Sequence, residues 1–303
     1  MFSSLSDVFS TNGPLAANIS GYRLRDQQLE MAEAVAAALK ENRVLVAEAG
    51  TGTGKTYAYL VPALMCGGKV IVSTGTKNLQ DQLFNRDLPT IRAALNVPVK
   101  TALLKGRANY VCHYHLQRSV SDGRFLSKED AGHARAISRF AKTTQTGDKG
   151  ECGDVPESSP VWSMVTSTRD NCLGQDCPNH KECFVLAARR EALAADVVVV
   201  NHHLFFADVM LKDEGMAELL PACNAVIFDE AHQLPETASL FFGENISTAQ
   251  VTDLARDAKL EGIASAKDCL DLPPACASLE KAAKDLRLTL SVDPARYTLA
   301  QLE

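Results

Sequence analysis

A glycine-rich run at Ala49–Thr56 (AGTGTGKT) has the residue types and the spacing that bind nucleotide phosphates. Its glycines would let backbone N–H groups curl around phosphate oxygens, and a helix starting at Thr56 would add its dipole. Lys55 would then reach the β- and γ-phosphates, and the Thr56 hydroxyl would bind Mg²⁺. A glycine-rich turn without a ligand is the alternative, but packing gives Lys55 and Thr56 no purpose. The predicted nucleotide-binding residues are Ala49, which replaces the Gly of the strict pattern, Gly50, Thr51, Gly52, Thr53, Gly54, Lys55 and Thr56.

An acidic motif, Asp229-Glu230-Ala231-His232, directly follows the apolar run Ala225–Phe228. The apolar run predicts a buried strand, and ligands of open α/β sheets bind at the carboxyl ends of strands. Asp229 would hold Mg²⁺ and Glu230 would orient and deprotonate the attacking water, so Lys55, Asp229 and Glu230 are the candidate catalytic residues. Acidic residues in the first turn of a helix are the alternative. His232 is a candidate for relaying the nucleotide state, or a polar residue at a strand end.

Three cysteines lie close together in the spacing C-x4-C-x5-C, and a fourth lies well upstream. Four thiolates suit zinc and an iron–sulfur cluster equally by ligand chemistry. Zinc sites favour CxxC pairs, which this segment lacks, whereas wider gaps suit the larger cuboidal cluster. Cys152 competes for the fourth position, and His113 and His180 are further ligands in the zinc alternative. The four candidate thiols are Cys112, Cys172, Cys177 and Cys183.

The composition of the 303 residues is that of an ordinary globular protein, with 46% hydrophobic and 22% charged residues. With a formal net charge of −6, the protein as a whole does not attract nucleic acid. Any binding of nucleic acid must therefore come from local basic patches. The N-terminus lacks the features of a secretory signal, and no apolar run is long enough for a membrane span. We therefore expect a cytoplasmic protein whose nine cysteines stay reduced.

Short apolar runs alternate with segments of helical periodicity along much of the chain. This order predicts an α/β fold with a parallel sheet covered by helices on both faces. Residues 1–21 are expected to be a loose segment, and residues 248–303 to be helical. The predicted strands are 44–47, 69–73, 101–104, 196–200 and 225–228, and the helices between them start near Asp26, Thr56 and Asn78.

The strand pattern breaks between residues 106 and 190, which are largely polar and contain five of the cysteines. We interpret this segment as an insertion into the α/β domain. The expected division is 1–105 for the first segment of a P-loop domain, 106–190 for the insertion, 191–238 for the second segment, and 239–303 for an incomplete helical unit.

Several motifs together resemble a known family. EAGTGTGKT with DEAH resembles the DEAH helicases of superfamily 2. Five stretches in the right order narrow this to the DinG-type, YoaA-like iron–sulfur helicases of the XPD-like branch, in which the P-loop domain is RecA-like. The matching stretches are 25–28 (the Q motif, through Arg25 and Gln28), 73–76 with 79–83 (motif Ia), 104–112 and 199–204.

The resemblance implies ATP-dependent 5′→3′ unwinding of DNA in repair and replication. It also implies ATP, Mg²⁺ and a [4Fe–4S] cluster as cofactors, with single-stranded or forked DNA and replication or repair proteins as partners, and no membrane. By the same resemblance Arg25 and Gln28 read adenine, and the cluster is bound at Cys112, Cys172, Cys177 and Cys183. The cluster would be structural, because a polar insertion has too little apolar content to fold alone.

Basic residues with nearby aromatic side chains in the insertion suit phosphate contact and base stacking. A solvated helix face is the alternative. These residues are Lys105, Arg107, Arg118, Arg124, Arg135, Arg139 and Lys142, with Tyr110 and Tyr114.

Superfamily 2 motors close ATP between two RecA-like domains, whereas this sequence shows one P-loop domain. We therefore expect the N-terminal part of a longer helicase, which binds nucleotide and does not unwind DNA alone. Two other functions stay open at this point. One is a nucleic-acid-binding or redox-sensing module with a vestigial ATPase, and the other is a zinc-bearing DEAH RNA helicase.

Overall fold

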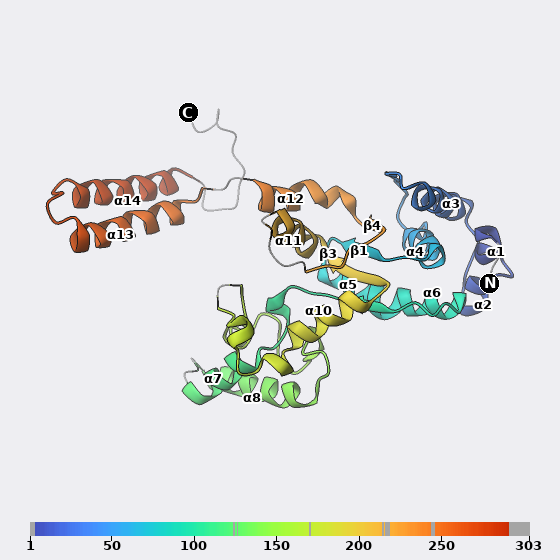
Figure 1. Cartoon of the computed structure of the whole chain (residues 1–303), viewed down its shortest axis with the longest axis horizontal. Helices are drawn as coiled ribbons and strands as arrows, with labels where there is room; N and C mark the ends of the chain where they lie inside the picture. The colour runs from blue at the N-terminus through green and yellow to red at the C-terminus, as the bar shows by residue number, and fades with distance from the viewer. Residues whose placement is uncertain are drawn as a thin grey trace. The chain divides into compact units, whose positions relative to one another are not determined.

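The computed structural model describes residues 4–290, except for 124, 126, 170, 214, 216–218, 244 and 245. The chain divides into two units, residues 1–241 and residues 242–303 (Figure 1). The strands are β1 (Val70–Thr74), β2 (Thr101–Leu103), β3 (Val197–Asn201) and β4 (Ala225–Phe228). The α-helices are α1 (Leu5–Phe9), α2 (Pro14–Asn18), α3 (Asp26–Glu41), α4 (Lys55–Cys66), α5 (Lys77–Gln82), α6 (Leu88–Leu95), α7 (His113–Asp122), α8 (Lys128–Thr143), α9 (Val161–Val165), α10 (Phe184–Ala194), α11 (His202–Asp213), α12 (Leu234–Phe242), α13 (Thr248–Ser265) and α14 (Leu272–Thr289).

The four strands form one parallel sheet in the order β2-β3-β1-β4. Val70 is in register with Val197 on one side and with Ala225 on the other, so the carboxyl ends of β3, β1 and β4 lie at one edge. The acidic motif leaves the sheet at this edge. The predicted α/β fold with a parallel sheet is therefore confirmed.

Both faces of the sheet are covered, as the unbroken apolar strands predict. Val72 and Val199 point to one side and join the core that contains α3, α4 and α6. Ile71 and Val198 point to the other side and pack with residues of α10 and α11. Figure 1 shows these two groups of helices on opposite sides of the strands. Successive side chains of a strand point to opposite faces, so each apolar run contributes residues to both cores.

The N-terminal residues are not the loose segment expected from their composition. Val8 and Phe9 of α1 and Leu15 of α2 have no exposed surface and join the core beneath α3. The Tyr22 hydroxyl donates to the Phe9 carbonyl at 2.8 Å. Ser, Asn and Gly in this segment form caps and turns between short helices, which polarity alone does not distinguish from a loop.

The predicted strand at residues 44–47 is wrong for this structure. Val44 and Val46 are 94% and 91% exposed, and no described backbone group pairs with this segment. A run of β-branched residues has a high propensity for β-strand. The strand forms only where a neighbouring strand pairs with its backbone hydrogen-bonding groups. β4 consequently forms one edge of the described sheet.

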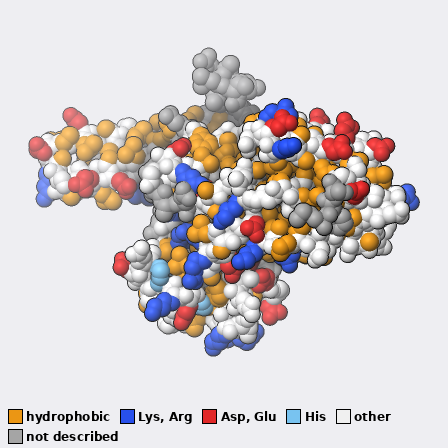
Figure 2. Space-filling model, turned by 45° about the vertical axis from the view of Figure 1, so that its right-hand side comes forward, with side chains coloured by type: hydrophobic (Ala, Val, Ile, Leu, Met, Phe, Trp, Pro, Cys, Tyr) orange, Lys and Arg blue, Asp and Glu red, His pale blue; other side chains and the backbone are white. Residues whose placement is uncertain are grey.

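The insertion has a hydrophobic core of its own, centred on Ile137 and Trp162 and built from residues 110–185. Isolated bridges join Tyr110 to Asp148 and Val111 to Thr166, and they hold its loops beside α7. Figure 2 shows Lys and Arg side chains interspersed with acidic ones over the lower part of the view, where Figure 1 places α7 and α8.

The second unit is a helical hairpin. The helix α13 begins at a capping box, in which Ser247 Oγ accepts from the Gln250 N–H at 3.1 Å and Gln250 Oε1 accepts from the Ser247 N–H at 2.8 Å. The helix α14 packs along α13, and Ala255, Cys276 and Ala283 are buried between them. No helix in the described part of either unit is long and apolar enough to cross a membrane.

Candidate functional site

The glycine-rich run forms a loop that ends where α4 starts at Lys55. Gly52 and Gly54 have φ angles of 80° and 84°, which glycine adopts readily because it has no Cβ. The Lys55 ammonium donates to the Ala49 carbonyl at 3.0 Å, and the Thr53 hydroxyl donates to the Gly50 carbonyl at 2.9 Å. The lysine therefore lies curled over its own loop, where its charge would meet a phosphate.

The two Q-motif residues brace this loop from α3. Gln28 Nε2 donates to the Gly54 carbonyl at 2.9 Å, and the Arg25 guanidinium donates to the Gly52 carbonyl. Gln28 is buried, whereas Arg25 is exposed. A Cβ added to Gly54 would lie 2.0 Å from Gln28 Nε2, so a side chain at this position would displace the Gln28 amide. The structure therefore places both side chains against the phosphate loop.

A cleft of about 350 Å³ opens beside the loop. The short helical segment Leu83–Asp87, which follows α5, lines the far side of this cleft. In that element Arg86 Nε donates to the buried Asp87 carboxylate at 3.1 Å. Sequence reasoning did not include Arg86 and Asp87, because they lie outside the motifs that it singled out. The lining consists of Gly52, Thr53, Gly54, Lys55, Thr56, Tyr57, Gln82, Arg86 and Asp87.

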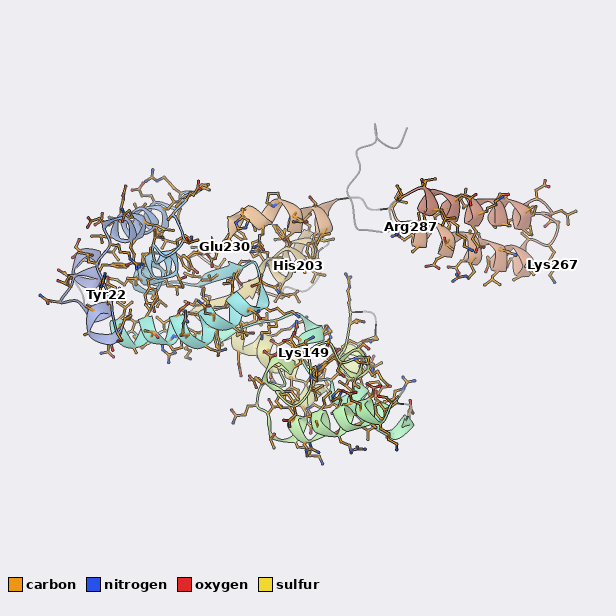
Figure 3. The ribbon with its side chains drawn as sticks, turned by 180° about the vertical axis from the view of Figure 1, so that it is seen from behind. Tyr22, Lys149, His203, Glu230, Lys267 and Arg287 are labelled. Carbon is orange, nitrogen blue, oxygen red and sulfur yellow. The ribbon has the colours of Figure 1, made fainter. Side chains whose placement is uncertain are left out.

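The acidic motif lies in the turn after β4, with Glu230 at the sheet edge (Figure 3). The Asp229 N–H donates to the Ser73 carbonyl at 2.8 Å, which extends the pairing of β4 with β1. Glu230 has a φ of 54°, in the left-handed region that a non-glycine residue adopts only rarely.

Burial raises the pKa of Asp229, and the Glu230 charge raises it further. The positive charge of Lys55 acts in the opposite direction and lowers the pKa of Asp229. Lys55 of the loop therefore lies near enough to Asp229 for its charge to act on that carboxyl, although 174 positions separate the two residues. The carboxylates of Asp229 and Glu230 lie near the start of α4, where Thr56 carries a hydroxyl. These oxygen atoms fit a divalent cation, which prefers oxygen ligands.

Tyr59 is a site residue that the sequence reading missed. Its buried hydroxyl lies beside Thr56 and Asp229, and among the described residues it has no hydrogen-bond partner of normal geometry. Burial raises the pKa of Tyr59 well above its usual value. The spacing contained a clue, because a residue three positions after Thr56 in a helix shares its face. An unpartnered polar atom here fits a site that takes a hydrated ion.

The two histidines near the acidic motif differ in their surroundings. His232 is largely exposed, and its Nδ1 lies 3.5 Å from Glu230 Oε2. His202 has no exposed surface, and its Nδ1 lies 2.7 Å from Ser73 Oγ. The backbone of Asp229 and Glu230 faces the His202 ring.

The four candidate cysteine ligands lie in one region of the insertion, and each is half-buried. Cys112 and Cys183 precede the first residues of α7 and α10, and Cys172 and Cys177 flank a short turn. Burial raises the pKa of the Cys112 thiol, and the nearby Cys177 and Cys183 raise it further. The four side chains are of a type that fits a shared metal group in its chemistry.

The side chains do not form a finished metal site. No group of three or more His, Cys, Asp or Glu residues in the described part of the chain has a metal-binding arrangement. Cys152 is buried in the core of the insertion. His113 stacks on Phe184, with ring centroids 4.7 Å apart.

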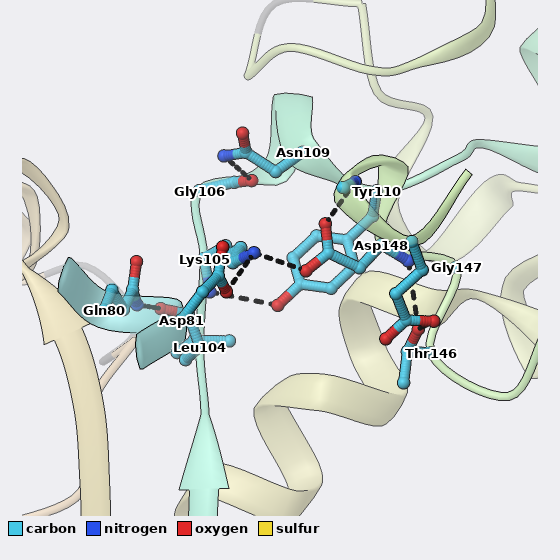
Figure 4. A network of polar contacts seen from close by, with 12 residues as sticks. Gln80, Asp81, Leu104, Lys105, Gly106, Asn109, Tyr110, Thr146, Gly147 and Asp148 are labelled. Atoms are coloured by element: carbon cyan, nitrogen blue, oxygen red, sulfur yellow. Dashed lines mark hydrogen bonds and ion pairs between the residues drawn. The ribbon is translucent and has the colours of Figure 1, made fainter. Parts of the chain in front are cut away.

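Two of the basic and aromatic residues proposed for nucleic-acid contact are not available for it. The Lys105 side chain is 5% exposed and pairs with Asp81 and Asp148. Tyr110 is 3% exposed, and its hydroxyl accepts from the Lys105 N–H. Both predictions are therefore wrong, because folding encloses Lys105 between two carboxylates that are distant in the chain (Figure 4) and packs Tyr110 into the core of the insertion. Arg124 lies outside the described residues, and Arg118, Arg135, Arg139 and Lys142 are exposed.

Comparison with known proteins gives the following matches. The DEAD/DEAH box helicase family matches residues 28–112. ATP-dependent DNA helicase YoaA of Haemophilus influenzae is 50% identical over 286 residues, which cover 94% of this chain and 45% of that protein. ATP-dependent helicase DinG of Mycobacterium tuberculosis is 37% identical over 294 residues, which cover 89% of this chain and 43% of that protein.

The resemblance to DinG-type, YoaA-like helicases is confirmed. A solved XPD helicase structure aligns with a TM-score of 0.47 at 18% identity, over 92% of this chain and 44% of its own. The chain spans about half the length of the curated relatives that it matches.

Proposed function

We propose that this chain supplies the nucleotide-binding part of an ATP-dependent DNA helicase. The observation that carries the proposal is the cleft lined by Lys55 and Thr56 of the glycine-rich loop, with Asp229 of the DEAH motif near enough for the Lys55 charge to lower its pKa. A cation for phosphates and a carboxylate for Mg²⁺ are the two charges that phosphoryl transfer requires at one site.

Each residue has a role in the proposed hydrolysis. Ala49–Thr56 holds the phosphates through its backbone, and Lys55 pairs with their negative charge. Thr56 and Asp229 hold Mg²⁺, which neutralises charge that develops on the phosphate oxygens. Glu230 orients the attacking water and takes its proton. Arg25 and Gln28 hold the loop and the adenine, and His232, beside Glu230, relays the nucleotide state.

We propose that residues 106–190 form a functional unit that binds a [4Fe–4S] cluster through Cys112, Cys172, Cys177 and Cys183. The nearness of Cys112 to Cys177 and Cys183 supports the ligand assignment, and the separate core supports the insertion as a unit. Bound there, the cluster would cross-link the loops that lead into α7 and α10. Iron and sulfide analysis of anaerobically purified protein tests it, and one zinc per chain without iron would contradict it.

The whole protein's activity follows the same proposal. We infer 5′→3′ translocation on single-stranded or forked DNA in the cytoplasm, with replication or repair proteins as partners. The 1–105 and 191–238 segments form the motor domain, and 239–303 begins a helical unit. The names of the YoaA and DinG relatives support the DNA and ATP parts of this inference.

DNA-stimulated ATPase activity of the full-length protein tests the function. Lys55→Ala is expected to abolish hydrolysis while the far-ultraviolet circular dichroism spectrum stays unchanged. Lys40→Ala, an exposed residue at the end of α3, is the control and keeps the parent rate. Hydrolysis by Lys55→Ala at the parent rate would refute the assignment of the loop.

A further inference from the structure

A histidine to which the proposed hydrolysis gives no role lies beside the acidic motif. His202 is the first residue of α11 and directly follows β3, an inner strand of the sheet. In the same turn Asn201 Oδ1 accepts from the Leu204 N–H at 2.8 Å. The His202 side chain has no exposed surface. The end of a strand and the start of a helix therefore hold this imidazole in place, out of reach of solvent.

Ser73 connects His202 to the acidic motif. The Ser73 hydroxyl lies 2.7 Å from His202 Nδ1, and the Ser73 carbonyl accepts from the Asp229 N–H at 2.8 Å. The rings of His202 and Phe228, the residue before Asp229, have centroids 6.0 Å apart. The ends of three neighbouring strands thus place the imidazole against the turn that carries Asp229 and Glu230.

The second ring nitrogen of His202 is buried without a partner. No described group forms a hydrogen bond of normal geometry with Nε2. Burial lowers the pKa of the His202 ring, and the backbone of Asp229 and Glu230 opposes this by raising it, as acceptors of a ring N–H do. An acceptor on this side requires hydrogen on Nε2, so Ser73 donates to Nδ1. A buried N–H without a partner favours any position of the turn that brings an oxygen into line with it.

The backbone of the turn offers one such oxygen. The Glu230 carbonyl already accepts from the Gln233 N–H at 3.0 Å, whereas no described group forms a hydrogen bond of normal geometry with the Asp229 carbonyl. The Asp229 carbonyl is therefore the acceptor that remains for Nε2. The planar peptide after Asp229 contains the Cα atoms of both acidic residues, so a hydrogen bond to its oxygen fixes the points from which both carboxylates extend.

We propose that His202 is a positioning residue for ATP hydrolysis, whose Nε2–H donates to the Asp229 carbonyl in the nucleotide-bound state and holds the Asp229–Glu230 peptide in place. The proposal rests on the proposed function and adds to it a buried residue that does not touch the nucleotide. Because His202 acts through the carboxylates that serve the chemical step, its loss should lower kcat and leave the KM for ATP nearly unchanged.

The test compares two amide substitutions that each reproduce one ring nitrogen. The shorter amide of His202→Asn can still bond to Ser73, and the longer amide of His202→Gln carries an N–H to the position of Nε2. ATPase activity of the full-length protein is measured at saturating oligodeoxythymidine over a range of ATP concentrations. His202→Asn should lower kcat by about ten- to hundredfold with KM within about threefold of the parent, and kcat of His202→Gln should exceed that of His202→Asn by about fivefold or more.

Two further variants complete the experiment. His133→Asn is the matched control, because His133 Nδ1 lies 3.0 Å from Ser159 Oγ in the insertion, and it should keep the parent kcat and KM. Ser73→Ala removes the donor that keeps the hydrogen on Nε2, so it should lower kcat several-fold without a change in KM. This variant keeps the proposal testable if both His202 variants fail to fold.

The outcomes separate this proposal from the proposed function. A parent kcat in His202→Asn or in Ser73→Ala overturns the role of His202. An equal loss of kcat in His202→Asn and His202→Gln also overturns it, because a merely structural role makes no distinction between the two ring nitrogens. Absence of DNA-stimulated ATPase in the parent protein would instead refute the proposed function.

Discussion

The hydroxyl of Ser73 lies 2.7 Å from Nδ1 of His202, and neither side chain has any exposed surface. Ser73 is near the end of β1, and His202 follows β3, so the contact joins the carboxyl ends of two neighbouring strands. The His202 ring also faces the backbone of Asp229 and lies 6.0 Å from the Phe228 ring. One buried imidazole thus supports three strands directly behind the proposed magnesium ligand.

This contact predicts the pH dependence of stability. Burial lowers the pKa of His202 below its usual value of 6.5, so the folded protein holds a neutral ring. The resulting stabilisation is fully present above pH 6.5 and is lost as pH falls toward the lower pKa of the folded state.

His202→Phe should lower the free energy of unfolding by about 1–3 kcal/mol at neutral pH, because it leaves the Ser73 hydroxyl unpaired. It should also reduce the loss of unfolding free energy in acid, as measured by urea unfolding at about pH 8 and about pH 5. An equal acid loss in variant and parent would show that His202 does not titrate with folding.

Tyr59→Phe tests the unpartnered hydroxyl beside Asp229. The unfolding free energy of the apo protein should change by less than about 1 kcal/mol, because the contacts of the hydroxyl with Thr56 and Asp229 lack hydrogen-bond geometry. Affinity for Mg²⁺–ATP should fall several-fold, since the hydroxyl faces the cation site. Tyr22→Phe is the matched control, because the Tyr22 hydroxyl does donate to the Phe9 carbonyl. It should lose about 1 kcal/mol of unfolding free energy and keep its nucleotide affinity. Calorimetric titration and thermal unfolding measure both effects, and equal behaviour of the two variants would remove Tyr59 from the site.

Gly54→Ala separates backbone strain from the packing of the loop. Gly54 and Gly21 have φ angles of 84° and 72°, so alanine strains both positions by about 1–2 kcal/mol. Only at Gly54 does the added methyl meet another residue, because Gln28 Nε2 lies 2.0 Å from the new Cβ and nothing lies within 4 Å of it at Gly21. Nucleotide affinity should therefore fall in Gly54→Ala and stay at the parent value in Gly21→Ala. Equal affinities in the two variants would show that Gln28 does not shape the loop.

Cys177→Ser tests the cluster through its metal content. The variant should lose iron and sulfide and lower the stability of the insertion, because the loops beside α7 and α10 lose their cross-link. Cys66→Ser changes an exposed cysteine outside the insertion and should keep the parent iron content. Iron retained at the parent level by Cys177→Ser would exclude this thiol as a ligand.

The sequence by itself determined the parallel sheet, the loop that ends at Lys55 and the turn that carries Asp229, because apolar period and glycine spacing are local properties. It also determined which thiols gather in the insertion, although not their final geometry. The sequence did not determine which strands pair with each other or which charged side chains form ion pairs. The β-type run at 44–47 stays outside the described sheet, and Lys105 is enclosed by Asp81 and Asp148 instead of facing solvent. Only the tertiary structure decides which strand edge is paired and which charge is neutralised, since both depend on residues distant in the chain that folding brings together.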